Sequence, residues 1–208
     1  RAYAVRTRHI KHDLVNWNNN FTWAKWVTPS RDLISAFKQE GDEVRFKESI
    51  VYYDCNWSNY YPSDNYPFMY KCRSANSSII KYRYADVLLL KAEALIMQDT
   101  PDLEGAADII DKVRDRAKLG ALPTSVRSNK NAMLNALLKE RRLELAFEGQ
   151  RWFDLVRLDK VEEVMNAVYA KDSGRKAQIY TFDKNSYRLP IPQSVIDAND
   201  KIHQNPGY

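Results

Sequence analysis

From residue 82 onward, apolar residues recur at every third or fourth position, which is the spacing of an α-helix. The segment 82–96 is apolar on two faces and rich in alanine, so we expect a helix buried between neighbours that approach closely. Asp99 and Pro101 break this pattern, and residues 106–117 resume it with a single apolar stripe that we expect to end at Gly120. Two antiparallel helices joined by a short turn form a helical hairpin, the unit of tetratricopeptide-type arrays.

Helical spacing continues beyond this hairpin. We expect a third helix over about 129–148 and a further one over 158–169. The tail from residue 171 is rich in turn residues, and a short hairpin around 178–188 and a short helix starting at Ser194 are expected there. The chain is therefore predicted to be mainly α, with tetratricopeptide-like helical hairpins, long irregular loops and a few short strands.

The first 80 residues differ in composition, being rich in Asn, Ser, Tyr and Trp and interrupted by several prolines. Within them Ser30 is expected to cap a short helix that buries Leu33, Ile34 and Phe37 as its apolar stripe and stops at Gly41. Residues 43–53 are expected to form one or two strands. We therefore divide the chain into an irregular, aromatic-rich region over 1–80, which holds the candidate ligand loops, and a helical region over 81–208.

The chain carries a formal net charge of +5, which raises the question of nucleic-acid binding. Four basic residues and no acidic residue lie within the first twelve positions, so the charges over the rest of the chain are nearly balanced. Tracking a nucleic-acid backbone needs Lys and Arg clustered across a docking surface, so nucleic acid is not an expected partner. No apolar run reaches the roughly 18 residues that span a bilayer as a helix.

Aromatic side chains gather in two short stretches of the first 80 residues. Eight lie between Tyr52 and Tyr70, and four lie between Trp17 and Trp26. Flat rings with a polar edge, carried on a loop of Pro, Asn and Ser, can stack on the apolar faces of sugars or on peptide side chains. Such rings can equally pack the loop onto the helices. The candidate ligand-binding rings are Trp57, Tyr60, Tyr61, Trp17 and Trp23.

Cys55 and Cys72 are the two cysteines of the chain, and they bracket much of the aromatic stretch. A disulfide between them would close a loop of about 18 residues and stabilise the fold by roughly 3 kcal/mol. Such a bond is expected in an oxidising compartment and not in the cytosol, and two cysteines alone do not identify the compartment. Cys55 and Cys72 are therefore a candidate disulfide pair.

Glu140, Glu144 and Glu148 repeat every four residues beside several arginines. Carboxylates can serve acid–base or metal chemistry, but glycoside hydrolysis uses two carboxyl groups that face each other across a cleft. Three acids on one helix face among arginines are explained more simply by ion pairs that hold helices together. No Gly-x-Ser-x-Gly motif occurs, and no histidine has neighbours at metal-ligand spacing. We therefore predict no catalytic residue, no metal and no cofactor.

Four segments of the helical region follow one another at characteristic spacings. They are KYRYADVLLLKAEAL (81–95), AADIIDKVRDRAKL (106–119), KERRLELAFEGQRWFDLVRLDK (139–160) and LPIPQSVIDANDKIHQNPGY (189–208). A fifth segment, PSRDLISAFKQEGDEVRF (29–46), precedes them. Together they closely resemble the C-terminal region of the SusD/RagB family, and the resemblance covers roughly residues 26–208.

The resemblance implies a largely helical fold in which tetratricopeptide-like helix pairs support irregular loops that carry the ligand surface. It implies that the PIPQ and QNPGY segments clamp the C-terminal tail against the body. The ligand residues of this family have no fixed motif, so none is carried over. The motif residues would determine the fold, with each buried charge paired. These residues are Arg83, Asp86, Glu93, Arg141, Arg142, Glu144, Glu148, Arg151, Trp152 and Asp154.

Members of this family are surface-exposed lipoproteins of the bacterial outer membrane that capture nutrients, most often glycans. The resemblance therefore implies a glycan or oligosaccharide ligand, a SusC-like TonB-dependent transporter as partner, and membrane attachment only through a lipid anchor outside these residues. Family members are longer than this chain. We therefore expect this chain to be a C-terminal fragment. Part of its apolar surface is then expected to pack against the other residues of the longer protein.

The leading hypothesis is thus a glycan-binding protein without catalytic activity. A second hypothesis is a helical protein-interaction scaffold that binds a peptide or the transporter without contacting sugar. A third is an enzyme such as a glycoside hydrolase, for which Glu144 and its two neighbours in the glutamate series are the candidate carboxylates.

Overall fold

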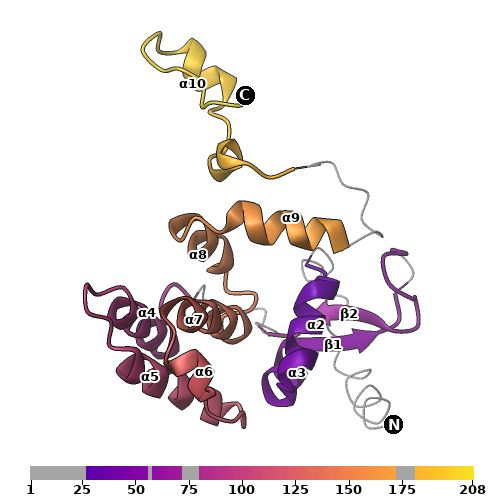
Figure 1. The fold of residues 1–208 in the computed structure, drawn as a ribbon. Helices are drawn as coiled ribbons and strands as arrows, with labels where there is room; N and C mark the ends of the chain where they lie inside the picture. Colours follow the sequence, from indigo (N-terminus) through magenta and orange to yellow (C-terminus); the bar gives the residue numbers. More distant parts are fainter. Residues whose placement is uncertain (1–26, 56–57, 72–79, 172–180) are drawn as a thin grey trace. The chain divides into compact units, whose positions relative to one another are not determined.

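The computed structural model describes residues 27–55, 58–71, 80–171 and 181–208 (Figure 1). As predicted, the described chain is mainly helical, with one small two-stranded sheet. It divides into two compact units, Arg1–Arg151 and Trp152–Tyr208. Within the described ranges, no helix is both long enough and apolar enough to cross a membrane. The predicted division into 1–80 and 81–208 rests on composition and stays a prediction.

The elements follow one another in a simple order. The first unit holds α2 (Arg31–Glu40), α3 (Glu43–Ser49), β1 (Ile50–Tyr53), β2 (Tyr66–Met69), α4 (Tyr84–Ile96), α5 (Leu103–Arg116), α6 (Thr124–Arg127) and α7 (Lys130–Glu144). Helix α8 (Arg151–Arg157) begins at the boundary, and the second unit continues with α9 (Val161–Lys171), the 3₁₀ helix η2 (Lys184–Tyr187) and α10 (Gln193–Asp197).

Helix α2 forms where the sequence predicts it. The Ser30 hydroxyl caps the helix by accepting a hydrogen bond from the Leu33 amide at 3.1 Å. Gly41 ends it at φ 69°, a left-handed conformation that glycine adopts without steric cost. The side chains of Ile34 and Phe37 are buried, so the predicted apolar stripe faces the interior.

The segment 43–53 begins as helix α3, so the strand predicted there is present only in its last part. Asp42 is the N-cap of α3, and its carboxylate accepts a hydrogen bond from the Arg45 amide at 3.1 Å. The same carboxylate pairs with the Arg45 guanidinium. Because the cap starts a helix, Arg45 and Phe46 both reach the interior, which an alternating strand would not allow for adjacent residues.

Strands β1 and β2 form an antiparallel hairpin, with Ile50 opposite Met69 and Tyr53 opposite Tyr66. Successive side chains of a strand point to opposite faces of the sheet. Ile50 packs on one face with residues of α2, α3 and α7. Val51 packs on the other face with residues of β2 and the connecting loop. The hairpin is therefore covered on both faces and holds the loop in a defined place.

Helices α4, α5 and α7 enclose the largest core of the first unit (Figure 1). The α4–α5 pair is the predicted helical hairpin. Asp102, rather than Pro101 before it, opens α5, because its carboxylate accepts a hydrogen bond from the Gly105 amide at 2.9 Å. The buried core residues include Leu89, Ala92, Ile96, Ala106, Ile110, Val113, Met133 and Leu137.

Two helices end earlier than predicted. Helix α5 ends at Arg116, and Lys118 adopts the left-handed conformation at φ 63° before Gly120 is reached. Helix α7 ends at Glu144 instead of residue 148, and the turn that follows contains Phe147 at φ 67°. Each of these turns places a residue other than glycine in the left-handed region. The positions of the glycines therefore did not predict where the two helices end.

The second unit has a small core of its own. Leu155, Val161 and Phe182 are buried together. The Asn166 side-chain amide donates to the Phe182 carbonyl oxygen at 2.9 Å and accepts from the Phe182 amide at 2.8 Å. The hairpin predicted around 178–188 is wrong in its described part, because Asp183 caps the 3₁₀ helix η2 there.

The PIPQ and QNPGY segments of the tail contact each other. The Gln204 amide accepts from the Ile191 backbone amide at 2.8 Å and donates to the Ile191 carbonyl oxygen at 2.9 Å. The Tyr208 hydroxyl donates to the Arg188 carbonyl oxygen at 3.2 Å. Helix α10 begins one residue before the predicted Ser194. The contacts close the tail on itself, and a clamp against the body stays a prediction.

Candidate functional site

The connection between β1 and β2 carries the described part of the aromatic stretch. The Cys55 amide donates to the Ser63 carbonyl oxygen at 2.7 Å, which closes the loop at its base. Next to it, Cys55 is buried with Val51, Tyr66 and Phe68. Because these last three residues belong to the paired strands, the loop side chains that pack on them are held in a defined position.

Three tyrosine rings of this loop and strand β2 meet edge to face. The centroids of Tyr60 and Tyr61 are 4.9 Å apart with an angle of 87° between the rings. The centroids of Tyr61 and Tyr66 are 5.6 Å apart with an angle of 80°. Edge-to-face packing brings the positive ring edge to the negative ring face. Tyr60 and Tyr61 are only half-buried, so part of each ring is exposed to solvent.

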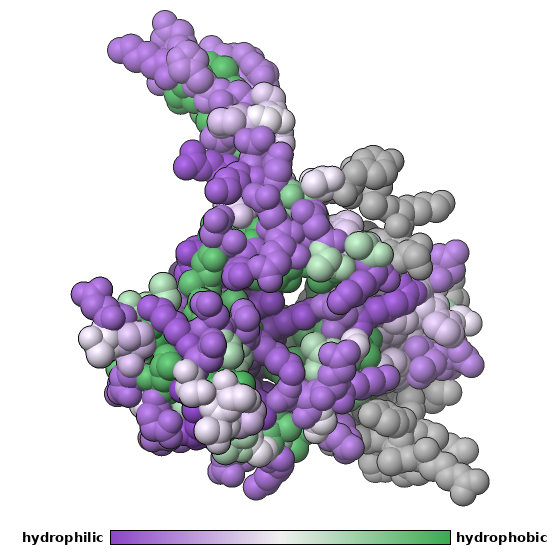
Figure 2. Space-filling view, viewed as in Figure 1, coloured by the Kyte–Doolittle hydropathy of each residue, from purple (hydrophilic) through white to green (hydrophobic). Residues whose placement is uncertain are grey.

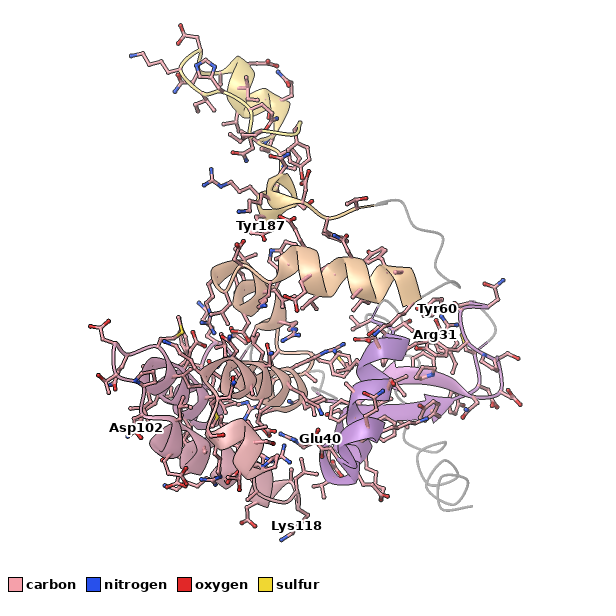
Figure 3. All side chains as sticks on the ribbon, in the orientation of Figure 1. Arg31, Glu40, Tyr60, Asp102, Lys118 and Tyr187 are labelled. Atoms are coloured by element: carbon pink, nitrogen blue, oxygen red, sulfur yellow. The ribbon has the colours of Figure 1, made fainter. Side chains whose placement is uncertain are left out.

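Arg31, the first residue of α2, lies over the tyrosine pair (Figure 3). Its guanidinium carbon is 4.1 Å from the centroid of the Tyr60 ring and 4.7 Å from that of Tyr61. Its Nη2 donates a hydrogen bond to the Tyr60 carbonyl oxygen. Cation–π contacts at exposed sites contribute about 0.5–1 kcal/mol each. The exposed arginine therefore holds the two rings and places a positive charge beside them.

Hydroxyl groups connect the loop to the residues that precede α2. The Tyr61 hydroxyl donates to the Pro29 carbonyl oxygen at 2.8 Å. The Tyr66 hydroxyl lies 3.0 Å from the Ser58 Oγ and 3.1 Å from the Thr28 Oγ1. Because the Tyr66 side chain is buried, its hydroxyl needs such partners. The loop and the start of α2 therefore hold each other in place. We call Arg31, Tyr60, Tyr61 and Tyr66 the tyrosine cluster.

The tyrosine cluster has the chemistry of a surface that binds a polar ligand with apolar faces. Partly exposed rings stack on the apolar face of a sugar ring, while hydroxyl, amide and carboxylate groups bond its hydroxyls. The loop supplies such groups at exposed positions beside the rings. They are Asn59, Ser63, Asp64 and Asn65.

The structure brings together two of the five predicted ligand-binding rings, Tyr60 and Tyr61. The other three, Trp17, Trp23 and Trp57, lie outside the described residues. The role of all five as ligand-binding rings stays a prediction. The sequence analysis missed Arg31 and did not select Tyr66 from the aromatic stretch. Arg31 contacts a residue 29 positions away, so no local spacing connects the two.

Cys55 is buried and forms no disulfide among the described residues, and its Sγ lies 3.9 Å from the Ser58 carbonyl oxygen. Its predicted disulfide partner, Cys72, lies outside the described residues. The pairing of the two cysteines therefore stays a prediction.

A second group of polar residues lies in the interior of the first unit, on helix α7. Glu140 and Glu144 are 1% and 2% exposed. The Nη1 of Arg45 lies 2.6 Å from Glu140 and 3.1 Å from Glu144. The Nη1 of Arg114 lies 3.3 Å from Glu140. Because Arg45 belongs to α3 and Arg114 to α5, these ion pairs join three helices.

Arg83, the residue before α4, joins the second and third glutamates of the series. Its Nη1 lies 2.6 Å from Glu144 and its Nε 2.7 Å from Glu148. Arg116 also pairs with Glu144, and the Lys71 Nζ lies 2.5 Å from Glu148. Each glutamate of the predicted series therefore has cationic partners, which confirms the interpretation as an ion-pair network.

Burial and ion pairing act in opposite directions on the pKa values of these glutamates. Burial raises the pKa of Glu144, but hydrogen bonds from Arg116 and Arg83 outweigh it and lower the pKa to about 2. Burial raises the pKa of Glu140 above its ordinary value, because its two arginines offset only part of the lost hydration. Glu144 is therefore ionised at neutral pH and serves as an ion-pair partner, not as a proton donor.

Other motif residues are also paired. The carboxylate of Asp86 and the guanidinium of Arg141 are both buried and lie 2.8 Å apart. The Nη2 of Arg142 lies 2.5 Å from Asp32 of α2. Removing one partner of a buried pair such as Asp86–Arg141 costs roughly 3–5 kcal/mol. The role of the motif residues as fold determinants, which the resemblance implies, stays a prediction.

Among the described residues, no group of three or more His, Cys, Asp or Glu side chains is placed to hold a metal ion. A cavity of about 140 Å³ lies at the α2–α3 turn, and Phe37 and Phe46 are among its lining residues. Ligand pockets usually measure about 300–1,000 Å³, so this cavity is too small for an oligosaccharide. The tyrosine cluster remains the candidate functional site.

The chain is similar to known proteins in sequence. Residues 63–208 match the sequence profile of the SusD family. SusD-like protein P38 of Formosa agariphila is 42% identical over 99 residues, which cover 45% of this chain and 19% of that protein. SusD-like protein P2 of the same organism is 35% identical over 143 residues, which cover 65% of this chain and 27% of that protein.

Solved structures share the fold. A SusD superfamily protein from Bacteroides vulgatus superposes with a TM-score of 0.63 at 23% identity, over 87% of this chain and 44% of that one. A laminarin-binding SusD-like protein superposes with a TM-score of 0.57 at 27% identity, over 87% of this chain and 38% of that one. The chain spans less than half of the length of each of these proteins. From the family profile, which matches more than half of the residues, the chain belongs to the SusD family.

Proposed function

We propose that these residues form the C-terminal part of a surface-exposed outer-membrane lipoprotein that binds a glycan and passes it to a SusC-like TonB-dependent transporter. The observation that carries the proposal is the tyrosine cluster, in which Arg31 holds the half-buried rings of Tyr60 and Tyr61. Membership of the SusD family supports it. So does the structural neighbour that is named as a laminarin-binding protein.

Contacts within the protein itself organise the cluster. The edge-to-face contact between Tyr60 and Tyr61, the guanidinium of Arg31 and the bond from the Tyr61 hydroxyl to Pro29 fix the orientation of the rings. A ligand that stacks on them does not have to order these side chains, which reduces the entropic cost of binding. Such a surface suits a saccharide, whose rings offer an apolar face and many hydroxyl groups.

We further propose that the protein has no catalytic activity. The glutamates that sequence analysis offered for hydrolysis are paired with arginines and lysine, and Glu144 is held ionised. Family membership supports binding without turnover. The location at the outer membrane, the lipid anchor and the transporter as partner rest on the same family membership.

Glycan binding is tested with variants of the cluster. The protein is first screened on a glycan array. Calorimetry then measures its affinity for laminarin, as the first soluble probe, and for the glycan that binds best on the array. Replacing Tyr60 or Trp57 by Ala is expected to weaken binding about tenfold, as for an aromatic contact worth somewhat more than 1 kcal/mol. Tyr82→Ala, which removes a 78% exposed ring outside the cluster, is the matched control and should leave the affinity unchanged.

The outcomes separate the two remaining hypotheses. If glycan affinity persists in Tyr60→Ala and Trp57→Ala, the loop is not the binding surface. If no glycan binds and the protein co-purifies with a TonB-dependent barrel, the chain is a protein-interaction scaffold instead.

A further inference from the structure

Tyr60 and Tyr61 are neighbours in the loop between the strands, but their surroundings differ. The Tyr61 ring packs against two apolar clusters at once, the one that contains Phe46 and the one that contains Val51. The Tyr60 ring packs against the second of these clusters. Because the two clusters lie on opposite faces of the hairpin, the position of Tyr61 is set by the fold from both sides.

The hydroxyl and the ring of Tyr61 are both engaged within the protein. The hydroxyl donates a hydrogen bond to the carbonyl oxygen of Pro29, a buried residue, at 2.8 Å. The ring lies at 87° to that of Tyr60 and at 80° to that of Tyr66, with centroid distances of 4.9 Å and 5.6 Å. A tyrosine held at its hydroxyl and beside two other rings offers little surface to a ligand.

Arg31 fills the corner between these two perpendicular rings. Its guanidinium carbon is 4.1 Å from the Tyr60 centroid and 4.7 Å from the Tyr61 centroid, and the two centroids are 4.9 Å apart. The three groups therefore form a nearly equilateral triangle in which each touches the other two. Because packed carbon atoms need about 3.5–4 Å between them, a sugar ring does not enter this corner while Arg31 occupies it.

The half-buried ring of Tyr60 lies in a polar part of the loop. Asn59 before it and Ser63, Asp64 and Asn65 after it are all exposed. Around this loop the surface is mainly hydrophilic or of intermediate hydropathy (Figure 2). An aromatic ring with such neighbours suits one sugar residue, whose apolar face stacks on the ring while the polar groups bond its hydroxyls.

We propose that Tyr60 is the ring of this pair that contacts the ligand, and that Tyr61 is a positioning residue that acts through Tyr60. Together the two tyrosines then recognise one stacked sugar residue, and not two adjacent ones. The assignment rests on the proposed function, because it divides the roles within the same glycan site. Tyr61 orders Tyr60 before the ligand arrives, so binding does not have to order that side chain.

A double-mutant cycle tests this division of roles. Tyr61→Leu keeps a large apolar side chain in place and removes the edge-to-face contact and the hydroxyl bond. Calorimetry with laminarin and with the glycan selected on the array should show binding about threefold to tenfold weaker than in the parent. In a Tyr60→Ala background, Tyr61→Leu should cause no further loss, because no Tyr60 ring is left to position. Tyr82→Ala in the same two backgrounds is the control and should change neither affinity.

Losses that add in the double variant overturn the proposal, because Tyr61 then contacts the ligand itself. An unchanged affinity in Tyr61→Leu overturns it as well. If circular dichroism shows that Tyr61→Leu does not fold, Tyr61→Phe takes its place in both backgrounds. That variant keeps the ring, removes the bond to Pro29, and should weaken binding about threefold in the parent and not at all in Tyr60→Ala.

Nuclear magnetic resonance of tyrosine-labelled protein gives a measurement that needs no ligand. The ring protons of Tyr60 lie in the field of the perpendicular Tyr61 ring, and Tyr60→Phe identifies their resonances. Tyr61→Leu should move these resonances towards those of an exposed tyrosine, and Tyr82→Ala should leave them in place. Resonances that stay in place in Tyr61→Leu overturn the positioning role.

The two measurements separate this inference from the proposed function. If a glycan binds and the losses of the two variants add, the proposed function stands and the division of roles is wrong. If the Tyr60 resonances move but no glycan binds, the proposed function is wrong and so is the ligand contact given to Tyr60, while Tyr61 still orients that ring.

Discussion

The guanidinium carbon of Arg31 lies 4.1 Å from the centroid of the Tyr60 ring, although Arg31 begins α2 and Tyr60 lies in the loop between β1 and β2. The Ser30 cap sets where α2 begins and so places Arg31 at its first position. The loop between the strands places Tyr60. A planar cation on a ring face fixes the orientation of the ring more firmly than an aliphatic neighbour does.

Replacing Arg31 by Met should weaken glycan binding about threefold to tenfold, because the side-chain volume stays and the cation–π contact is lost. The measurement is calorimetry with the glycan selected on the array. Lys38→Met, which removes an exposed charge from the same helix, is the control. Equal losses in the two variants would show that net charge, and not the contact with Tyr60 and Tyr61, supports binding.

The pairing of Glu144 makes the stability of the fold depend on acid pH. Its pKa is about 2 in the folded protein, below the ordinary value of 4.5 for a glutamate side chain. A carboxyl group with a depressed pKa stabilises the fold fully above its unfolded pKa, and this contribution is lost as the pH falls through the folded pKa. The free energy of unfolding should therefore fall between about pH 4.5 and pH 2, by up to roughly 3 kcal/mol from this group.

Urea unfolding at a series of pH values measures this dependence. Glu144→Gln should lower the free energy of unfolding at pH 7 by about 3 kcal/mol, because Arg83 and Arg116 lose a buried partner. It should also flatten the change between pH 4.5 and 2. Asp99→Asn, an exposed acid in the turn after α4, is the control. A Glu144→Gln profile with the same acid slope as the parent would contradict the role given to this carboxylate.

The turn between α2 and α3 depends on a glycine for its backbone conformation. Gly41 has φ +69°, and a methyl group added there would meet no atom within 4 Å. Gly41→Ala should therefore cost about 1 kcal/mol through the left-handed conformation alone. Gly120 has equally open surroundings and no such φ, so Gly120→Ala should be neutral or stabilise by about 0.4–1 kcal/mol. Equal effects in urea unfolding would show that the turn does not retain this conformation.

Local chemistry explains where the sequence analysis succeeded. The Ser30 cap, the stripe that includes Phe37 and the stop at Gly41 all depend on neighbours a few residues apart, so α2 was predicted closely. The α4–α5 hairpin was predicted for the same reason. The strand expected over 43–53 begins only at Ile50, because the carboxylate of Asp42 caps helix α3 before it. Arg45 of this helix pairs with Glu140 and Glu144, which are far away in the sequence, so local patterns did not reveal these contacts.

The candidate site was predicted in part. Tyr60 and Tyr61 were found from the density of aromatic residues, which is a property of composition. Their fixed orientation was not predictable, because it depends on Arg31 and on the bond from the Tyr61 hydroxyl to Pro29, 32 residues away. The assignment of Trp57 to the same surface stays a prediction.

The sequence by itself determined the helical class, most helix positions and the membership of a family. It also predicted that Glu140 and Glu144 pair with arginines, without identifying which ones. The helix positions follow from apolar periodicity, and the pairing follows from the cost of burying an unpaired charge. The family follows from the resemblance of the ordered sequence motifs and from the match to the family profile. Only the tertiary structure decided which arginine meets which carboxylate, since Arg45 and Glu140 are 95 residues apart. It also showed that Tyr84 and Val87 of α4 are exposed, because packing against α5 and α7, among the described residues, occupies one side of that helix.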